Sequence, residues 1–358
     1  MARFAVVVYG DIQKTSGGNY YDRMLIRALE ARGHAVKVTT PESIKNRLKE
    51  KTPPGVDAYI IDELCHPDFW RGRDFSGFHE GTILIAMTHH LAAEEHLGSF
   101  VRFRHLFQER FFFKHIDYCI CNSSATKEAA RRIAGYKGPA SVAVPGVTRP
   151  AQEKQIRDAQ RENGKGRVLS VEKPIKLLSL GNLIPRKGIH HLIKCMAIEP
   201  RLPCSLEIAG NMETDPAYTG ELRKLTAKLR LEEQVSFLGF VTESEKGRLL
   251  KEADFLIVPS DHEGYGIVYL EAMEYGTVPV GTRSGGASEV IRHGSNGFLV
   301  PPHSPKSLYE ILLQCIQNPA VYRRSSQSAV ETWLRHPTWD STFDEVLYEL
   351  ESFIQSGS

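Results

Sequence analysis

The chain has 358 residues, a formal net charge of +2 at pH 7 and a hydrophobic content of 41%. This length exceeds the size at which single hydrophobic cores stop growing, so we expect two domains. The near-neutral charge argues against a nucleic-acid-binding protein. No apolar run reaches the roughly 20 residues that span a bilayer, and no terminal segment has the order of a signal peptide, which together predict a soluble, cytoplasmic protein.

The six cysteines lack the spacing of zinc or redox motifs. Cys119 and Cys121 alternate on one face of an expected strand, and the others stand among apolar residues. This pattern indicates reduced cysteines in a core.

Apolar runs alternate with helical periodicity along residues 1–150. The strand-like runs cover residues 3–10, 34–40, 57–63, 82–90, 117–123 and 140–146. A helix is expected at 19–33, ending at Gly33. Because these runs are continuously apolar, they are typical of strands covered on both faces in a parallel sheet. The fold class is therefore α/β, and the first domain is doubly wound.

Residues 151–172 are highly charged without an apolar stripe, which predicts a solvated linker. The strand and helix pattern then restarts and predicts a second doubly wound domain over residues 173–337. Its expected strands cover residues 175–182, 204–211, 234–240, 254–260, 278–282 and 297–302.

Ligands of doubly wound sheets bind at the carboxyl ends of the strands, so we looked for polar motifs there. Gly17 and Gly18 follow the first strand and precede a helix, where bare backbone amides can approach an anionic or hydroxyl-rich ligand; a tight turn is the alternative. Arg186 and Lys187 follow the first strand of the second domain, just before a helix. Two cations at a helix N-terminus are disfavoured by the helix dipole, so we expect a bound phosphate to neutralise them. The alternative is a pair of solvated surface residues.

The stretch SDHEGYGIVYLEAMEYG, residues 260–276, combines two carboxylates with a glycine-rich helix start. Gly264 and Gly266 leave the amides of Ile267 and Val268 available to phosphate oxygens. Glu263 and Glu271 then flank the phosphates. Glu271 lies about 6 Å along the helix from its start, at 1.5 Å per residue. This arrangement suits a nucleotide sugar, with Glu263 holding the sugar and Glu271 the ribose.

These motifs resemble the family-4 retaining glycosyltransferases, whose signature is a glutamate, seven residues and a second glutamate. EGYGIVYLE matches that signature, and SGGASEVIRHGSNGFLVPP, PRKG, FLGFV and DYCICNSSATKEAARRI are similar to further family segments, the last with Ser124 as its helix N-cap. The resemblance implies a GT-B fold: two facing Rossmann-like domains with an interdomain cleft, and a C-terminal helix at about 338–358 that returns to the first domain. By the same resemblance, THHLAAEE holds the active-site histidine, with His89 the better match and His90 beside it.

Residue patterns and resemblance together give two sets of site residues. The expected catalytic residues are His89, Arg186, Lys187 and Glu263. The expected donor-binding positions are Gly17, Gly18, Arg186, Lys187, Gly239, Phe240, Val241, Glu263, Gly264, Tyr265, Gly266, Ile267, Val268 and Glu271. One departure is Asn182, where many family members carry an arginine.

The resemblance implies transfer of a sugar from a nucleoside diphosphate, UDP- or GDP-linked, to an acceptor hydroxyl with retention at the anomeric carbon. We expect no cofactor and no metal ligand, since the chain contains no Asp-x-Asp. Suitable acceptors are a sugar, a lipid-linked glycan or a small molecule, in cell-envelope glycan, glycolipid or glycosylated-metabolite biosynthesis; no nucleic acid is expected as a partner.

Three other functions remain open. A nucleotide-sugar epimerase on the same fold is disfavoured by the glutamate spacing, and a non-catalytic nucleotide-sugar-binding partner of a transferase is kept open by Asn182. A dinucleotide oxidoreductase is disfavoured because no G-x-G-x-x-G follows the first strand of either domain.

The segment SFVRFRHLFQERFFFKHID, residues 99–117, allows two interpretations. Phe103, Leu106, Phe107 and Phe111 form one apolar stripe of a helix, which Phe112 and Phe113 widen, and basic residues flank it. It is either a core helix with solvated flanks or a helix that rests on the inner face of an anionic membrane.

Overall fold

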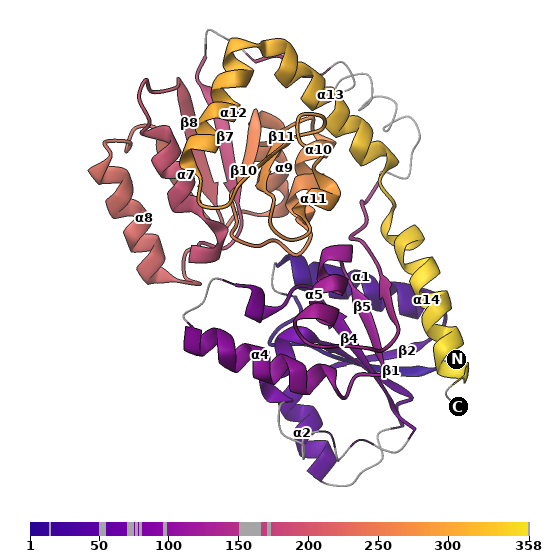
Figure 1. Ribbon diagram of the computed structural model, residues 1–358. Helices are drawn as coiled ribbons and strands as arrows, with labels where there is room; N and C mark the ends of the chain where they lie inside the picture. Colours follow the sequence, from indigo (N-terminus) through magenta and orange to yellow (C-terminus); the bar gives the residue numbers. More distant parts are fainter. Residues whose placement is uncertain are drawn as a thin grey trace. The chain divides into compact units, whose positions relative to one another are not determined.

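The chain folds into two compact units, shown in the computed structural model of Figure 1. One unit comprises Met1–Gly146 and Pro337–Ser358, and the other comprises Val147–His336. The structure describes residues 1–13, 16–49, 55–69, 75, 78, 81–95, 99–149, 166–169 and 173–356. Apart from 166–169, the predicted linker at 151–172 lies outside these residues.

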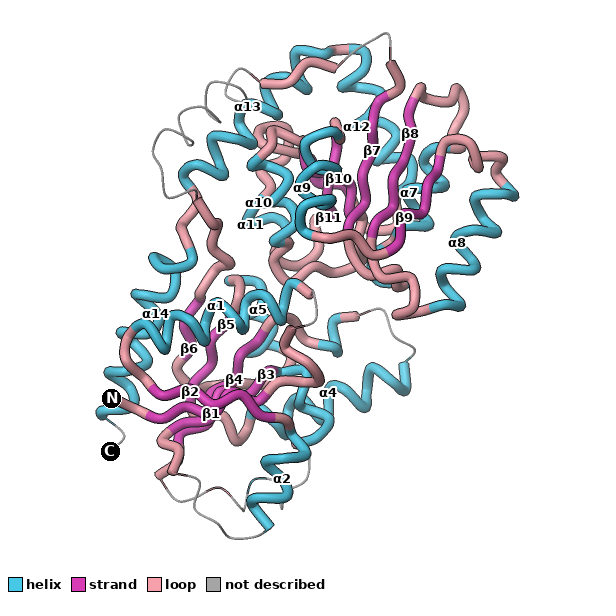
Figure 2. Tube along the Cα trace, turned by 180° about the vertical axis from the view of Figure 1, so that it is seen from behind, coloured by secondary structure: helices cyan, strands magenta, loops and turns pink. Residues whose placement is uncertain are grey.

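The first unit is built on a parallel sheet whose described strands run in the order β2-β1-β3-β4-β5-β6 (Figure 2). The strands are β1 (Arg3–Val7), β2 (Ala35–Thr39), β3 (Ala58–Asp62), β4 (Ile83–Thr88), β5 (Tyr118–Cys121) and β6 (Ala140–Val142). The helices are α1 (Gly17–Ala31), α2 (Pro41–Lys49), α4 (Ser99–Phe113), α5 (Ser124–Arg132) and α14 (Trp339–Ser356), with short 3-10 turns η1 (Glu63–Asp68) and η2 (Ala92–Glu94).

Helix α14 belongs to the first unit although it ends the described chain. It packs against α1, where the Trp339 and Tyr21 rings meet edge to face at 5.5 Å. Arg32 Nε, just after α1, donates to Glu351 Oε1 of α14 at 2.8 Å. The side chains of α14 therefore complete the packing of α1.

The second unit has the same architecture, with described strands in the order β12-β11-β10-β7-β8-β9. The strands are β7 (Ile175–Leu180), β8 (Cys204–Ala209), β9 (Val235–Gly239), β10 (Phe255–Val258), β11 (Val278–Thr282) and β12 (Phe298–Val300). The helices are α7 (Ile189–Met196), α8 (Pro216–Lys228), α9 (Glu243–Glu252), α10 (Ile267–Glu274), α11 (Ala287–Val290), α12 (Pro305–Gln317) and α13 (Pro319–Arg335), with the 3-10 turn η3 (Pro185–Lys187). The prediction of two doubly wound parallel sheets is confirmed.

Burial of the strands follows their place in the sheets. Every residue of the central strands β3, β10 and β11 is buried, as continuous apolarity predicts. Two-sided coverage is wrong for β2, which is largely exposed because it is the edge strand of its sheet.

The cysteines are free thiols buried in the cores, as predicted. All six lie in the described part of the chain. Among the described helices none is long and apolar enough to cross a bilayer.

Two local predictions need correction. The N-cap of α5 is Ser123 rather than Ser124, since the Ser123 hydroxyl accepts from Thr126 N at 2.9 Å. In α4 the predicted apolar stripe is wrong: Phe112 and Phe113 are core residues, whereas Phe103 and Phe107 are exposed by 68% and 55%. The core contacts of α4 come from its C-terminal end. Periodicity alone does not predict this, because three consecutive phenylalanines, residues 111–113, fit more than one buried face.

Candidate functional site

The turn after β7 brings Arg186 and Lys187 to the loop that follows β10. Lys187 Nζ lies 2.7 Å from Glu263 Oε2, and Arg186 Nη1 donates to the His262 carbonyl at 2.9 Å. Gly188 makes this approach possible, because it has φ +65° and a Cβ at that position would lie 2.1 Å from the Pro259 carbonyl oxygen. The loops after two neighbouring strands, β7 and β10, thus bring their charged side chains together at one edge of the sheet.

Glu263 is a largely buried carboxylate, with 14% of its side chain exposed, held in its charged form. The Ser260 hydroxyl donates to Glu263 Oε2 at 3.1 Å, the same oxygen that Lys187 approaches. Burial by itself raises the pKa of Glu263, but the charges of Lys187 and Arg186 and the two hydrogen bonds outweigh it and lower the pKa to about 2. Glu263 is therefore an ionised hydrogen-bond acceptor at neutral pH.

Helix α10 begins directly after this loop. Gly266 is its N-cap, and the first amide bonded inside the helix is that of Tyr269, which donates to the Gly266 carbonyl at 2.9 Å. The amides of Ile267 and Val268 precede that bond, at the positive end of the helix dipole. Tyr265 is only 3% exposed, so its ring packs inside the protein rather than facing the loop's surface.

A second glycine loop closes on the first. Gly286 N donates to the Glu263 carbonyl at 2.7 Å, and Gly285 forms an isolated parallel bridge with Glu263. Gly285 has φ +72°, and a Cβ there would lie 2.1 Å from the Glu263 carbonyl oxygen. The glycine pair after β11 therefore fixes the backbone of Glu263.

Glu271 is bound by a lysine that the sequence did not reveal. Lys246 Nζ of α9 lies 2.6 Å from Glu271 Oε1. Burial raises the pKa of Glu271, while Lys246 opposes that rise. The ion pair with Lys246 thus offsets part of the cost of burying this carboxylate, whose pKa stays raised.

The segment Gly239–Phe240–Val241 begins at the last residue of β9 and leads into α9, the helix that carries Lys246. Gly239 has φ +74°, and the Phe240 side chain is 62% exposed. Thr242 then caps α9 with a capping box formed with Glu245. Helix α9 therefore begins shortly after the exposed Phe240 ring and carries Lys246, which pairs with Glu271.

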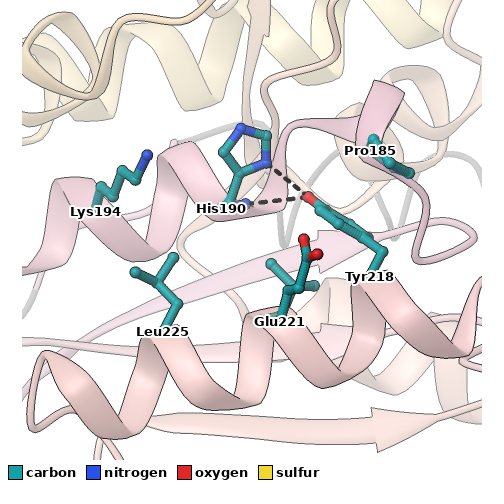
Figure 3. A pocket seen from close by; sticks show the side chains of 7 residues that line it. Pro185, His190, Lys194, Tyr218, Glu221 and Leu225 are labelled. Carbon is teal, nitrogen blue, oxygen red and sulfur yellow. Dashed lines mark hydrogen bonds between the residues drawn. The ribbon is translucent and has the colours of Figure 1, made fainter.

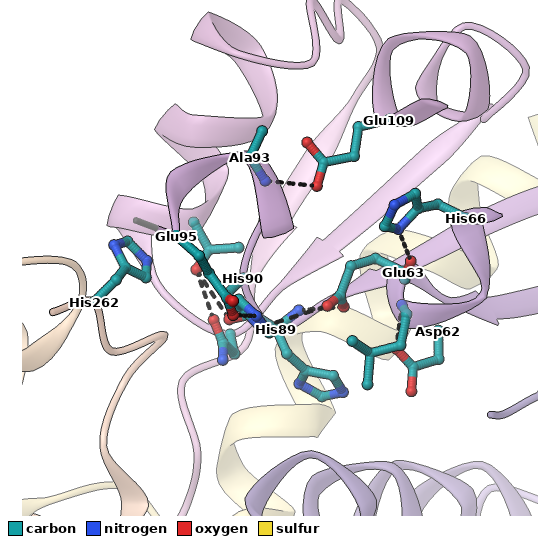
Figure 4. A network of polar contacts seen from close by, with 12 residues as sticks. Asp62, Glu63, His66, His89, His90, Ala93, Glu95, Glu109 and His262 are labelled. Carbon is teal, nitrogen blue, oxygen red and sulfur yellow. Dashed lines mark hydrogen bonds and ion pairs between the residues drawn. The ribbon is translucent and has the colours of Figure 1, made fainter. Parts of the chain in front are cut away.

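In the first unit, His89 lies at the end of β4 inside a cluster of buried acids (Figure 4). His89 Nε2 is 3.0 Å from Asp22 Oδ1, and the His89 amide donates to Glu63 Oε2 at 2.8 Å. Burial lowers the pKa of His89, but Asp22, Glu63 and Asp62 outweigh it and raise the pKa to about 10. The ring is therefore an imidazolium at neutral pH.

Burial also shifts the pKa values of the acids around His89. Burial and the nearby Asp22 raise the pKa of Asp62 to about 7, although His89 opposes the rise. Burial likewise raises the pKa of Glu63 well above its usual range. His90 also reaches this cluster, with Nδ1 3.6 Å from Glu63 Oε1, while its Nε2 lies 3.0 Å from Glu95 Oε1.

Gly17 and Gly18 open α1 rather than forming a separate turn. The Ser16 hydroxyl caps the helix by accepting from Asn19 N at 3.1 Å. A Cβ on Gly18 would lie 3.4 Å from Cδ2 of His89, in ordinary van der Waals contact. The structure thus brings Gly18 and His89 together, in the first unit, and Arg186, Lys187, Glu263 and the start of α10 together, in the second.

A pocket of about 400 Å³ lies between α7 and α8 (Figure 3). His190 and Tyr218 line it, with His190 Nδ1 2.8 Å from the Tyr218 hydroxyl. Pro185 of η3 also lines it, but the predicted site residues do not, so the pocket is separate from the charged loops.

Sequence reasoning missed Lys246, Ser260, Asp22, Asp62 and Glu63. Ser260 lies three residues before Glu263, so a helix-like spacing could have suggested it. Asp22 could have been suggested by its spacing from Leu25 and Leu29, three and seven residues on, which places it on the buried face of α1.

Comparison with known proteins finds similarity to glycosyltransferases. Residues 160–332 match the family model described as "Glycosyl transferases group 1". An uncharacterized glycosyltransferase of Methanocaldococcus jannaschii is 39% identical over 133 residues, which cover 37% of this chain and 33% of the relative. The chain spans about a third to a half of the length of the first curated relatives that it matches.

Two solved structures share the whole fold. Sucrose-phosphate synthase from Thermosynechococcus elongatus superimposes with a TM-score of 0.81 at 20% identity and covers 100% of both chains. The Anabaena protein HepE, solved in complex with UDP-glucose, gives a TM-score of 0.74 at 20% identity and covers 98% of this chain and 100% of that one. The fold is therefore of the GT-B type.

Proposed function

We propose that the chain is a group 1 glycosyltransferase of family 4 and that it transfers a sugar from a nucleoside-diphosphate sugar to an acceptor hydroxyl with retention at the anomeric carbon. The observation that carries the proposal is the meeting of Lys187, Glu263 and the start of α10 at the carboxyl ends of β7 and β10. A cation, helix amides and an ionised carboxylate together suit a sugar joined to a diphosphate.

The charged groups support distinct roles. In this proposal Lys187, Arg186 and the amides of Ile267 and Val268 stabilise the departing diphosphate, where negative charge develops in the transition state. Glu263 accepts hydrogen bonds from sugar hydroxyls. The leaving phosphate takes the acceptor's proton, and the acceptor hydroxyl attacks the anomeric carbon directly, without a protein nucleophile. Because the cations and the helix amides stabilise the diphosphate, the proposed reaction needs no metal there.

His89 is proposed to contact the sugar and acceptor. Because Asp22 and the neighbouring acids keep its ring protonated, His89 serves as a hydrogen-bond donor rather than as a general base. Gly18, packed beside the ring, leaves its backbone accessible at the helix start.

For the nucleotide, we propose that Glu271 accepts from the ribose and that Gly239–Phe240–Val241 contacts the base. Glu271 keeps a side chain that is 30% exposed while Lys246 holds one of its oxygens. HepE was solved in complex with UDP-glucose, which supports a uridine donor here, with GDP-sugars as the alternative.

An exposed aromatic face on α4 favours a lipid-linked acceptor. Phe100, Phe103 and Phe107 repeat at helical spacing and are exposed, and Arg104 and Lys114 share this side of the helix. Aromatic side chains beside cations fit an anionic membrane surface. We propose that this face docks there and brings the acceptor within reach.

Incubation with labelled UDP- and GDP-sugars tests the proposal. A transferase releases free sugar slowly even without its acceptor, whereas an epimerase interconverts sugars and a non-catalytic partner binds donor without releasing sugar. No release from any donor, together with no nucleotide binding, would contradict the proposed function.

A further inference from the structure

A cluster of two histidines and an aspartate lies in the second unit, beside the loop of Glu263. His191 comes from α7, Asp261 from the loop after β10 and His303 from the segment after β12. Their ligand-type atoms all lie within 4.8 Å of one another. We propose that His191, Asp261 and His303 bind a divalent transition-metal ion of the zinc class.

The spacing of the three side chains fits a single ion. His191 Nε2 lies 3.1 Å from His303 Nδ1, and His303 Nδ1 lies 3.3 Å from Asp261 Oδ1. Ligand atoms about 2.0–2.1 Å from a tetrahedral zinc ion are about 3.3–3.4 Å from one another. The distance between His303 and Asp261 therefore matches an edge of a zinc coordination tetrahedron, and the distance between His191 and His303 is slightly shorter than one.

Proton placement also favours a cation. His303 Nδ1 makes both contacts, yet a ring nitrogen carries either one proton or one lone pair. If His303 Nδ1 accepts a hydrogen bond from His191 Nε2, its lone pair also faces the negative Asp261 carboxylate. If His303 Nδ1 carries a proton instead, that single hydrogen has to be shared between His191 and Asp261. A metal ion instead accepts a lone pair from each of the three atoms.

The chemistry of the donors is appropriate for zinc. Two imidazoles and one carboxylate leave a fourth position for water. The His303 side chain is 47% exposed, which gives an ion a path from solvent.

The backbone holds His303 in an uncommon conformation. Its φ is +56°, in the left-handed region that non-glycine residues seldom adopt. This conformation directs the ring toward His191, with the two ring centroids 5.1 Å apart. The ion would join three segments of the second unit, and Asp261 N already donates to the Arg186 carbonyl at 2.8 Å. We assign it a clamping role next to the charged loops and no part in sugar transfer.

Equilibrium dialysis of the tag-free, chelator-treated chain against Zn²⁺ tests the proposal, with Co²⁺ as a spectroscopic probe of the coordination geometry. We expect one tightly bound Zn²⁺ per chain and the visible absorption of tetrahedral Co²⁺. His303→Asn should weaken Zn²⁺ binding at least tenfold, since asparagine tolerates the left-handed backbone but supplies no imidazole. Asp261→Asn should do the same.

His190→Asn is the matched control, because this neighbouring histidine faces Tyr218 and lies outside the cluster. It should keep the wild-type affinity for Zn²⁺, and circular dichroism checks the fold of each variant. Equal Zn²⁺ affinity in the wild type and in both cluster variants would overturn the proposal and leave a hydrogen-bonded triad. Dialysis requires no turnover, so its outcome is independent of the proposed transferase activity.

Discussion

Lys187 Nζ and Glu263 Oε2 lie 2.7 Å apart, although 76 residues separate them in the chain. The pair joins the carboxyl ends of β7 and β10 and keeps Glu263 ionised. Each partner has a second function in the proposal, because Lys187 also faces the diphosphate and Glu263 the sugar. One substitution in this pair therefore changes both binding and chemistry.

Lys187→Ala should lower kcat by about 10²–10³, the range for loss of a preorganised donor to a developing oxyanion. Initial rates with the best donor measure this effect. Lys228→Ala, an exposed lysine at the end of α8, is the control and should keep the wild-type rate. A folded Lys187→Ala enzyme with wild-type kcat would remove Lys187 from the proposed mechanism.

Glu271→Ala should weaken binding of the free nucleoside diphosphate by roughly 1.5–3 kcal/mol, the range for a hydrogen bond to a charged group. Isothermal calorimetry with UDP and GDP measures the change. Glu274→Ala, which removes another carboxylate of α10, should leave nucleotide affinity unchanged. If a folded Glu271→Ala variant binds nucleotide normally, the carboxylate serves only to pair with Lys246.

Glu263 and Glu271 show which parts of the site could be predicted from the sequence and which could not. The strand pattern and the spacing of Glu263 and Glu271 indicate the fold and the loop, because both depend on local periodicity. The partners Lys187 and Lys246 come from other elements. A lysine on a helix such as α9 looks solvated until the packing of α9 on α10 is known.

His89 illustrates the same limit in the first unit. Its position at a strand end was predictable, but its charge depends on Asp22 and Glu63, which reach it from α1 and η1. The α4 prediction failed for a related reason. A phenylalanine run is compatible with several buried faces, and only tertiary packing selects Phe112 and Phe113 for the core.

The His89 ring should stay protonated throughout the neutral range, because its pKa is raised to about 10. Its Cε1 proton resonance, assigned by comparison with His89→Gln, should not titrate between pH 6 and 8. In Asp22→Asn the pKa of His89 should fall, since the carboxylate that raises it is gone. A wild-type His89 resonance that titrates near the ordinary histidine value would contradict this charge state.

The same shift has a consequence for stability. A raised histidine pKa stabilises the fold fully below the ordinary value of 6.5, and that stabilisation is lost as the pH rises through about 10. Urea unfolding of wild type and His89→Gln should therefore show a difference in free energy that shrinks between pH 7 and 10.

The exposed face of α4 should bind anionic liposomes at low salt and release them at high salt. Phe103→Ser/Phe107→Ser and Arg104→Ala/Lys114→Ala should each reduce co-sedimentation. Tyr348→Ser is the control, because Tyr348 on α14 is equally exposed at 68%. A wild-type protein that stays in the supernatant at low salt would favour a soluble acceptor.

The most direct test of the account is the anomeric configuration of the sugar that wild-type protein releases from its nucleotide donor, followed by proton NMR from the first turnovers. Transfer to water at the site of Lys187 and Glu263 predicts that the first-formed sugar has the same anomeric configuration as the donor, and that Lys187→Ala releases it far more slowly. Release of the opposite anomer, or equal release by wild type and Lys187→Ala, would contradict the proposed site and its retaining chemistry.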